Sequence, residues 1–343
     1  MQPKVLSSPV RLALVGAGIF ARDAHVPSLL RLPDNFEIVA VYSRTAATAS
    51  ALAAMLPNSP QIHTDLNALL ADQTIEAVDV MLPIDVMAST VAQALASGKH
   101  VISEKPIAPD LATGRQLLNA YRQSSTSHAQ QVWMVGENWR YEAAFLQAAD
   151  FVRNGAIGRP ITCHIAHYAP VLPTSKYYHS AWRRSGNFPG GYILDGGIHQ
   201  VASLRLIVGE VAAVSAILTQ VNPDLQPADT ISATLHFANG ALGTYLASYA
   251  VGSPWPAYLH VVGEKGSLRV LRGEIEFTSE GKTQMIKCEG FDGVQKELAA
   301  FATAIREGSP HRNSAEEALR DLAVVEAMLH AAESGQRVAV SQQ

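Results

Sequence analysis

The sequence predicts an α/β fold in two domains, a parallel sheet flanked by helices followed by an α+β domain with a large, mainly antiparallel open sheet. Over the first third, short apolar runs alternate with helical stretches rich in Ala and Leu, which favours a parallel sheet. After about residue 138, strand-like runs follow one another without helices, which favours antiparallel pairing. A chain of 343 residues also exceeds what one core ordinarily serves. We expect domains at 1–137 and 138–343.

The first domain is expected to open on the apolar run VRLALV at 10–15, which is followed by glycine and is typical of a strand buried on both faces. The elements that follow are expected in this order: helix 19–32, strand 36–42, helix 45–56, strand 61–63, helix 66–70, strand 77–82, helix 86–97, strand 100–103, helix 111–123 and strand 131–137.

The second domain is expected to begin with a helix at 145–154, which Gly155 and Gly158 end. Its strands are expected at 161–168, 212–220, 231–237, 242–248, 258–262 and 267–270. Asn239-Gly240 is a strong signal for a hairpin between two of them. Helices are expected at 295–307 and 314–333, and Ser314 with Glu317 resembles a capping box. Packing of the last helix back on the first domain is an arrangement that the sequence leaves open.

Composition excludes several classes of partner. The net charge of −4, from 26 Lys and Arg against 30 Asp and Glu, favours neither a nucleic-acid surface nor an anionic-membrane surface. Cys163 and Cys288 are far apart, so we expect free thiols in a reducing compartment, with one disulfide left open. Zinc-ligand spacing is missing, and we expect no metal.

The beginning of the chain, MQPKVLSSPV, has no apolar run of signal-peptide length. No stretch reaches the roughly 18 apolar residues of a membrane helix. We therefore expect a cytoplasmic protein.

A glycine loop follows the first expected strand. Gly16 and Gly18 allow a tight turn and a close approach of the backbone to a pyrophosphate, and Ile19 and Phe20 begin a helix whose amides face it. This context predicts that the first domain is a Rossmann dinucleotide-binding domain.

The end of the second expected strand reads Ser43-Arg44-Thr45, where a site for NAD would ordinarily carry an acid that accepts hydrogen bonds from the ribose hydroxyls. A hydroxyl and a guanidinium suit a 2′-phosphate instead. We expect NADP(H) as the cofactor. The alternative is that Arg44 is a solvated residue at the start of the next helix.

Two further stretches of the sequence indicate a protein family. VISEKPIAPD ends a strand in Glu104-Lys105-Pro106, and GGYILDGGIHQ places Asp195 four residues before His199. Together with the glycine loop and ENWRYEAAFLQAADFVRNGAIGRP, they make the chain resemble the glucose–fructose oxidoreductase/inositol dehydrogenase/MocA (Gfo/Idh/MocA) family over nearly its whole length.

The resemblance implies a nicotinamide-dependent oxidoreductase acting on sugars, polyols or related molecules, with Lys105, Asp195 and His199 at the family's catalytic positions. The chemistry agrees: Lys105 ends a strand where ligands bind and can polarise a substrate oxygen. His199 can accept or donate the proton, and Asp195 can orient. The plainer alternatives are a surface lysine, a buried structural histidine and a helix N-cap.

The residues expected to bind the cofactor are Gly16, Gly18, Ile19, Phe20, Ser43, Arg44, Thr45, Leu82, Pro83, Glu104 and Lys105. Two positions depart from the family pattern: Ile84 stands where a polar Asn is frequent, and Ala202 where many members have Asp. The first alters contacts with the nicotinamide half, and the second alters the surroundings of His199.

Arg140, Tyr168 and Trp182 are expected to line the substrate site with Asp195 and His199, since aromatic faces suit sugar C–H groups and arginine suits oxygen atoms. The alternative is that these rings belong to the core. By analogy, the open sheet is expected to pair into a homo-oligomer, a dimer or a tetramer. Two other functions stay open: a non-catalytic NADP-sensing regulator, and a glycoside-cleaving enzyme that recycles bound NAD.

Overall fold

The computed structural model describes residues 8–125, 131–184, 186 and 188–341, and the chain divides into two compact units. The first unit is Met1–Asn138 with Val294–Ala318, and the second is Trp139–Gly293 with Leu319–Gln343. The first segment of the first unit ends at Asn138, beside the boundary expected at 137/138. Residues 294–318 differ, because they group with the first unit although they lie far along the chain.

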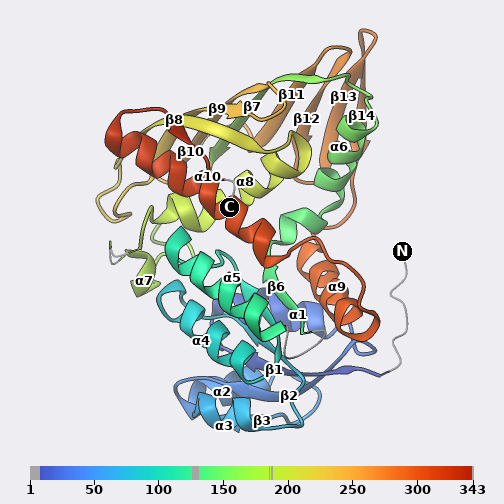
Figure 1. Cartoon of the computed structure of the whole chain (residues 1–343), viewed down its shortest axis with the longest axis vertical. Helices are drawn as coiled ribbons and strands as arrows, with labels where there is room; N and C mark the ends of the chain where they lie inside the picture. The colour runs from blue at the N-terminus through green and yellow to red at the C-terminus, as the bar shows by residue number, and fades with distance from the viewer. Residues whose placement is uncertain (1–7, 126–130, 185, 187, 342–343) are drawn as a thin grey trace. The chain divides into compact units, whose positions relative to one another are not determined.

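The first unit is built on a six-stranded sheet in the order β3-β2-β1-β4-β5-β6, in which every neighbouring pair is parallel (Figure 1). The strands are β1 (Val10–Val15), β2 (Phe36–Tyr42), β3 (Gln61–His63), β4 (Ala77–Val80), β5 (His100–Glu104) and β6 (Trp133–Gly136). The strand order reverses between β1 and β4, and ligands of open α/β sheets bind at such a point, beyond the carboxyl ends of the strands. The expected Rossmann-type sheet is confirmed.

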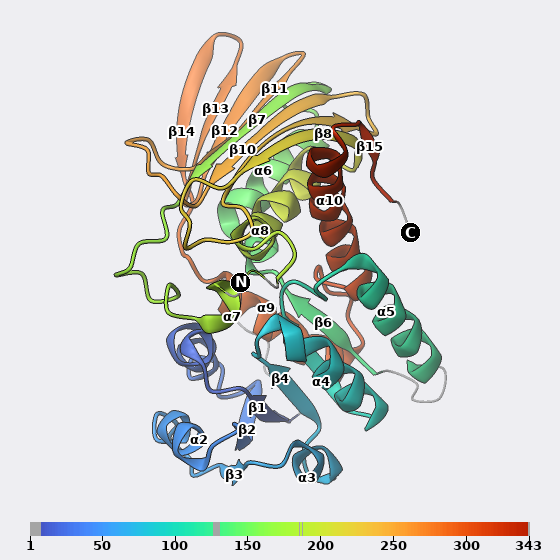
Figure 2. The same cartoon turned by 90° about the vertical axis from the view of Figure 1, so that its left-hand side faces the viewer.

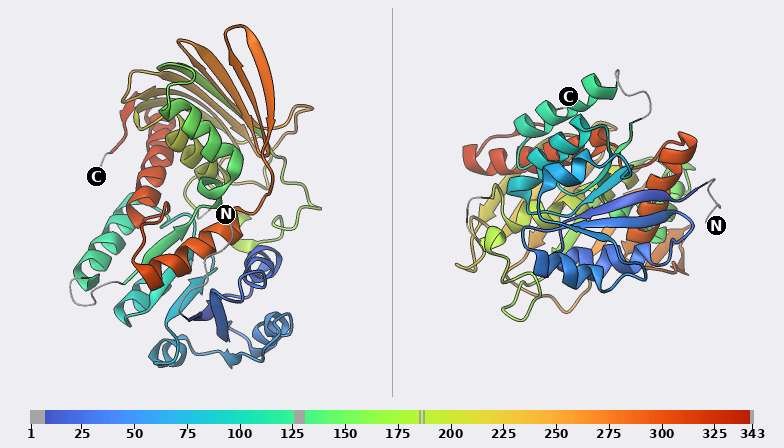
Figure 3. Two further views of the ribbon diagram at one scale, coloured as in Figure 1. Left: turned by 90° about the vertical axis from the view of Figure 1, so that its right-hand side faces the viewer. Right: turned by 90° about the horizontal axis from the view of Figure 1, so that it is seen from below.

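Helices cover both faces of this sheet. Seen from below in Figure 3, the blue helices near the N-terminus lie on one side of the strands and the teal helices on the other. The helices of the first unit are α1 (Val26–Leu29), α2 (Ala46–Ala53), α3 (Leu66–Ala71), α4 (Ile84–Ala96), α5 (Leu111–Ser125) and α9 (Gly293–Glu307).

The helix expected at 19–32 is not uniform. A π-helical turn, η1 (Ala21–His25), precedes α1, and the Val26 N–H bonds to the Ala21 carbonyl, five residues back. Pro27 has no N–H to donate at the next position, so the regular ladder cannot run through this point. Single π-turns inside helices are frequent at functional sites.

The second unit is built on a nine-stranded sheet in the order β14-β13-β12-β11-β7-β10-β9-β8-β15 (Figure 2). Only the β7–β10 pair among these is parallel, which confirms the expected mainly antiparallel sheet. The strands are β7 (Pro160–Tyr168), β8 (Val211–Thr219), β9 (Thr230–Phe237), β10 (Leu242–Ser248), β11 (Tyr258–Gly263), β12 (Gly266–Leu271), β13 (Glu274–Ser279), β14 (Lys282–Lys287) and β15 (Val338–Ala339).

One face of the nine-stranded sheet is covered by helices (Figure 2). The helical elements outside the first unit are η2 (Asn138–Tyr141), which begins at the boundary, α6 (Ala143–Arg153), α7 (Ala181–Arg184), α8 (Tyr192–Ile207) and α10 (Ala315–Ser334). The division between the units falls within α10, after Ala318. Ser314 Oγ accepts the Glu317 N–H at 3.2 Å, which confirms the expected cap of that helix.

The hairpin predicted from Asn239-Gly240 is confirmed. Gly240 has a φ of +88°, and Asn239 Oδ1 accepts the Ala241 N–H at 3.0 Å. The strands β13, β14 and β15 and the short helix α7 were not predicted. β14 reads KTQMIK and is almost fully exposed, so no apolar alternation marks it. Within the described ranges, no helix is both long and apolar enough to cross a membrane.

Candidate active site

The glycine loop fits a dinucleotide. Gly16 has a φ of +112°, and a Cβ there would lie 2.4 Å from the carbonyl oxygen of Met81, so only glycine lets the loop pack on the end of β4. A Cβ at Gly18 would meet nothing within 4 Å, which leaves open space beside the loop for a pyrophosphate. Leu82 lies against Gly16, and Pro83 is the N-cap of α4. Ile84 is buried as the first residue of that helix.

The three residues after β2 that were predicted to bind the cofactor have different surroundings. Ser43 is half-buried and its N–H donates to the His63 carbonyl at 3.2 Å. Thr45 is the N-cap of α2, and its Oγ1 accepts the Thr48 N–H at 3.3 Å. Arg44 is exposed between them. Its guanidinium therefore lies in solvent, where a bound cofactor can reach it.

The end of β5 brings Glu104 into contact with His25. Glu104 is the last residue of β5 and Lys105 follows it directly. Glu104 Oε1 lies 2.9 Å from His25 Nε2, and the other ring nitrogen, Nδ1, lies 2.6 Å from Asp79 Oδ2. No sequence pattern had given His25 this role.

Asp195 and His199 lie one helical turn apart on α8, so they share one face of that helix, as expected from their spacing. Asp195 is not the N-cap, which corrects one of the alternatives weighed above, because α8 begins at Tyr192 with Gly191 as the capping residue. Arg183 Nε donates to Asp195 Oδ2 at 2.7 Å, which fixes the carboxylate.

Aromatic rings fix the imidazole of His199. Its ring stacks on Trp139, with centroids 5.4 Å apart and planes at 16°, and Trp139 stacks in turn on Phe145. His167 of β7 faces the same group: its burial, and secondarily the charge of His199, lower the pKa of His167 to about 4. His167 is therefore a neutral base at pH 7. Trp139 lies in the stretch ENWRYEAAF and His167 in the strand expected at 161–168, but neither residue was assigned to the site from the sequence.

The glycines between Asp195 and His199 have a packing cause. A Cβ at Gly196 would lie 2.3 Å from the Tyr249 hydroxyl, and one at Gly197 would lie 2.9 Å from the Tyr245 hydroxyl. Both hydroxyls donate to Gln200 Oε1, at 3.3 and 3.1 Å respectively. The DGG stretch thus lets α8 approach β10 closely. Ala202 on the same helix is fully buried, where an Asp would need a buried partner.

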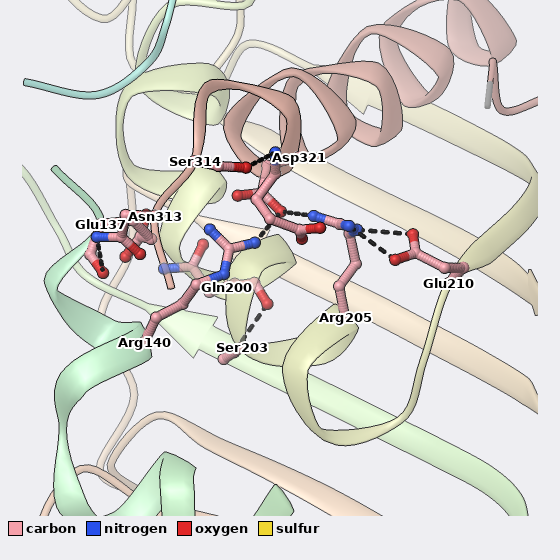
Figure 4. A network of polar contacts seen from close by, with 10 residues as sticks. Glu137, Arg140, Gln200, Ser203, Arg205, Glu210, Asn313, Ser314 and Asp321 are labelled. Atoms are coloured by element: carbon pink, nitrogen blue, oxygen red, sulfur yellow. Dashed lines mark hydrogen bonds and ion pairs between the residues drawn. The ribbon is translucent and has the colours of Figure 1, made fainter. Parts of the chain in front are cut away.

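The predicted substrate-lining residues differ in their surroundings. Arg140 is buried, and its Nη2 donates to Asp321 Oδ1 at 2.8 Å in a network that also contains Arg205 and Glu210 (Figure 4). This geometry gives Arg140 a structural partner, and its role toward substrate stays a prediction. Tyr168 is half-buried at the end of β7.

Trp182 is half-buried on α7, with the Arg183 guanidinium 4.0 Å above its ring. Arg183 therefore joins the ring of Trp182 to the carboxylate of Asp195. Both cysteines are free thiols, so the disulfide left open by the sequence is not formed. Among the described residues, no group of three or more His, Cys, Asp or Glu side chains is arranged to hold a metal ion.

Two family models match the chain. The model described as "Oxidoreductase family, NAD-binding Rossmann fold" matches residues 10–130, and the one described as "Oxidoreductase family, C-terminal alpha/beta domain" matches residues 149–340. The two matches correspond closely to the parallel and antiparallel sheets.

Similar proteins include a dehydrogenase of Fusarium mangiferae, FPY6, which is 34% identical over 94% of this chain and 96% of its own length. A D-xylose 1-dehydrogenase (NADP(+)) of Haloferax volcanii is 25% identical over 88% of this chain and 91% of its own. Among solved structures, an oxidoreductase of Thermotoga maritima is 33% identical with a TM-score of 0.89, covering 97% of this chain and 98% of that one.

Proposed function

Because the chain belongs to the Gfo/Idh/MocA family of oxidoreductases, we propose that it transfers a hydride between C4 of NADP(H) and an alcohol or carbonyl carbon of a sugar, polyol or related small molecule. The observation that carries this proposal is the pair on α8: Asp195 held by Arg183, and His199 stacked on Trp139 one turn later. A fixed imidazole can transfer the proton of an alcohol–carbonyl interconversion, and a fixed carboxylate on the same helix face can orient the substrate.

In this proposal His199 accepts the hydroxyl proton when an alcohol is oxidised and returns it when a carbonyl is reduced. The stacked Trp139 restricts the tilt of the imidazole, so the proton moves along one direction. Asp195 orients the substrate by accepting from a hydroxyl. Lys105 stabilises the negative charge that develops on the substrate oxygen, and its ammonium suits that task as a compact cation. The bound cofactor would supply or accept the hydride.

In this proposal the residues that follow β2 determine whether NADP(H) or NAD(H) binds. Gly16, Gly18, Ile19 and Phe20 would hold the pyrophosphate, while Arg44 with Ser43 would take the 2′-phosphate of NADP(H). The exposure of Arg44 supports this, since a guanidinium in solvent is available for bidentate contact. The matched domain is described as NAD-binding, and the Haloferax relative carries NADP(+) in its name, so the family comparison leaves both cofactors in use.

The test is turnover with reduced and oxidised cofactor against a panel of polyols, sugars and simple carbonyls, followed by nicotinamide absorbance. We expect activity that falls by about 10²-fold or more in His199→Asn and in Lys105→Met. His330→Asn and Lys282→Met are the matched controls, since both side chains are exposed on other elements, and we expect them to retain activity. Tight cofactor binding without turnover across the panel would contradict the proposal and favour a nucleotide-sensing regulator.

We also propose that the protein forms a homo-oligomer through the open face of its nine-stranded sheet. The register places Ser215, Thr234, Thr244, His164, His260, Arg269, Glu276 and Met285 in one row across the sheet. Ile217 and Leu242 lie two residues from this row and so share its face. Ile217, Leu242 and Met285 are 75%, 51% and 53% exposed, an apolar surface that a second copy would cover.

Sedimentation velocity tests this arrangement. We expect Ile217→Lys to shift the protein toward the monomer, because a charge would be buried on association. Met55→Lys adds the same charge at an exposed apolar position of the other unit and is expected to leave the oligomer unchanged. A monomeric wild-type protein at micromolar concentration would contradict the proposal.

A further inference from the structure

His25 is buried between two carboxylates of the first unit. Its side chain is 1% exposed, and that of Asp79, in β4, is fully buried. Nδ1 lies 2.6 Å from Asp79 Oδ2 and Nε2 lies 2.9 Å from Glu104 Oε1, so both ring nitrogens contact acids. The two acids are 54 and 79 residues away in the sequence. The imidazole therefore connects three separate elements: η1, β4 and β5.

The hydrogen-bond chemistry sets the charge on this ring. A carboxylate accepts and does not donate, so a histidine between two carboxylates bonds both only when both nitrogens carry hydrogen. Burial disfavours the charged ring, but the charges of Asp79 and Glu104 and their hydrogen bonds outweigh it and raise the pKa of His25 well above its ordinary value. His25 is thus an imidazolium within the unit.

The other acids that face this group come from α9 and from the end of β6. Burial, with the nearby charge of Glu104, raises the pKa of Glu297 in α9 well above its usual range. Glu297 Oε2 accepts from Asn313 Nδ2 at 3.1 Å. Glu137, which follows β6, is also buried and adds to the field at Glu297. His25 has Asp79 and Glu104 as its hydrogen-bonded acids. Burial raises the pKa of Asp79, and the charge and hydrogen bond of His25 oppose that rise.

Glu104 is confined by its neighbours, and the His25 ring also contacts the glycine loop through Phe20. A Cβ at Gly136 would lie 3.1 Å from Glu104 Oε1, so the neighbouring strand closes the space on that side. On the other side, Phe20 packs edge-on against the imidazole, with ring centroids 5.2 Å apart. Phe20 lies two residues after Gly18, and Lys105 directly follows Glu104. One ring therefore touches both the start of the loop helix and the residue before Lys105.

We propose that His25, held as an imidazolium by Asp79, is a positioning residue that fixes Glu104, and through it Lys105, together with Phe20 at the glycine loop. The part that concerns Lys105 rests on the function proposed above. The remainder depends only on the first unit. Displacement of a reacting group by about 1 Å can cost about 10²-fold in rate, so loss of this ring should act on chemistry at a distance.

The charge is tested first in the free protein. With ¹⁵N-labelled histidine, the His25 ring is expected to show two protonated nitrogens at pH 7, assigned by its loss in His25→Gln. A neutral His25 ring at pH 7 would overturn the proposal, whatever the enzyme's activity.

Positioning is tested by binding and by rate. We expect His25→Gln to weaken cofactor binding by about tenfold and to lower kcat by about 10- to 100-fold, with a smaller change in the KM of the substrate. His100→Gln is the matched control, since His100 begins the same strand at its other end and accepts the Val132 N–H at 3.0 Å through Nδ1. Unchanged cofactor affinity in folded His25→Gln would overturn the proposal. A wild-type protein without turnover would contradict only the proposed function, because binding and the ring spectrum are measured without turnover.

A pH profile separates positioning from simple stabilisation. Asp79→Asn removes the charge that favours the imidazolium, so His25 loses its proton at a lower pH and kcat should fall as pH rises through that value. Glu104→Gln, which removes the other charge, is expected to act in the same direction and serves if Asp79→Asn does not fold. Variant profiles that superimpose on the wild-type profile would overturn the proposal.

Discussion

The guanidinium of Arg183 donates through Nε to Asp195 Oδ2 at 2.7 Å. Arg183 lies on the short helix α7 and Asp195 in the first turn of α8, and the side chains are 17% and 12% exposed. The ion pair is therefore largely shielded from solvent and stronger than a surface pair. It fixes the Asp195 carboxylate, to which we assign the orientation of a substrate hydroxyl in the proposed function.

Removing this partner is expected to impair orientation more than folding. In Arg183→Gln the carboxylate loses its charged donor and gains freedom, so we expect kcat/KM to fall by about tenfold or more. Steady-state kinetics measure this. Arg184→Gln is the control, because Arg184 pairs at 3.3 Å with Asp224, an exposed residue of another loop. Equal kinetics in the two variants would show that Arg183 does not orient Asp195.

Arg44 is expected to determine cofactor preference. Arg44→Asp replaces a donor to the 2′-phosphate by a repelling charge, so NADPH binding should weaken by about 10- to 100-fold, the equivalent of a charged hydrogen bond of about 1.5–3 kcal/mol. NADH binding should be unchanged or tighter. Isothermal titration of both cofactors before and after the change measures this. Wild-type protein that binds NADH as tightly as NADPH would contradict the assignment.

Asp321 is expected to be a strong determinant of stability. It accepts hydrogen bonds from both Arg140 and Arg205, and all three side chains are at most 4% exposed (Figure 4). Asp321→Asn leaves two buried cations facing a neutral amide, so we expect the free energy of unfolding to fall by about 3–5 kcal/mol in urea titrations. Glu210→Gln is the control with a smaller expected loss, since Glu210 is 40% exposed. A loss below about 1 kcal/mol for Asp321→Asn would contradict this account of the network.

His167 is expected to make stability depend on pH. Its pKa is lowered to about 4 in the folded chain, chiefly by burial, so the unfolded chain binds more protons between about pH 4 and pH 6.5. The contribution is complete above pH 6.5 and is lost as pH falls toward 4, by at most about 3 kcal/mol. Urea unfolding of wild type and His167→Gln at pH 7 and pH 4.5 measures it. The prediction fails if the variant loses as much stability on acidification as the wild type does.

Elements with a periodic or punctuated sequence were predictable, and the others were not. The six strands of the first unit, the Asn239-Gly240 hairpin and the Ser314 cap were all predicted, because each depends on neighbours along the chain. β14 was missed because its exposed side chains carry no apolar alternation. The expected helix at 19–32 became a π-turn before α1, since Pro27 interrupts the hydrogen-bond ladder.

In the candidate site, too, local features were predictable and long-range contacts were not. Asp195 and His199 were identified by the resemblance to the family, and α8 gives them the shared face that their spacing predicted. The contacts that position them come from elsewhere in the chain: Trp139 lies 60 residues before His199. The His25–Asp79–Glu104 cluster spans 79 residues, and only the order of strands in the sheet brings its members together. No local pattern carries such information.

The most direct test of the central claim is the transfer of deuterium from NADPH labelled at C4 to a carbonyl substrate, followed by mass spectrometry of the product. We predict one deuterium in the product, from one of the two C4 epimers only, and a rate at least about 10²-fold lower in His199→Asn. A product without deuterium from either epimer, or transfer that is unaffected by His199→Asn, would contradict the account.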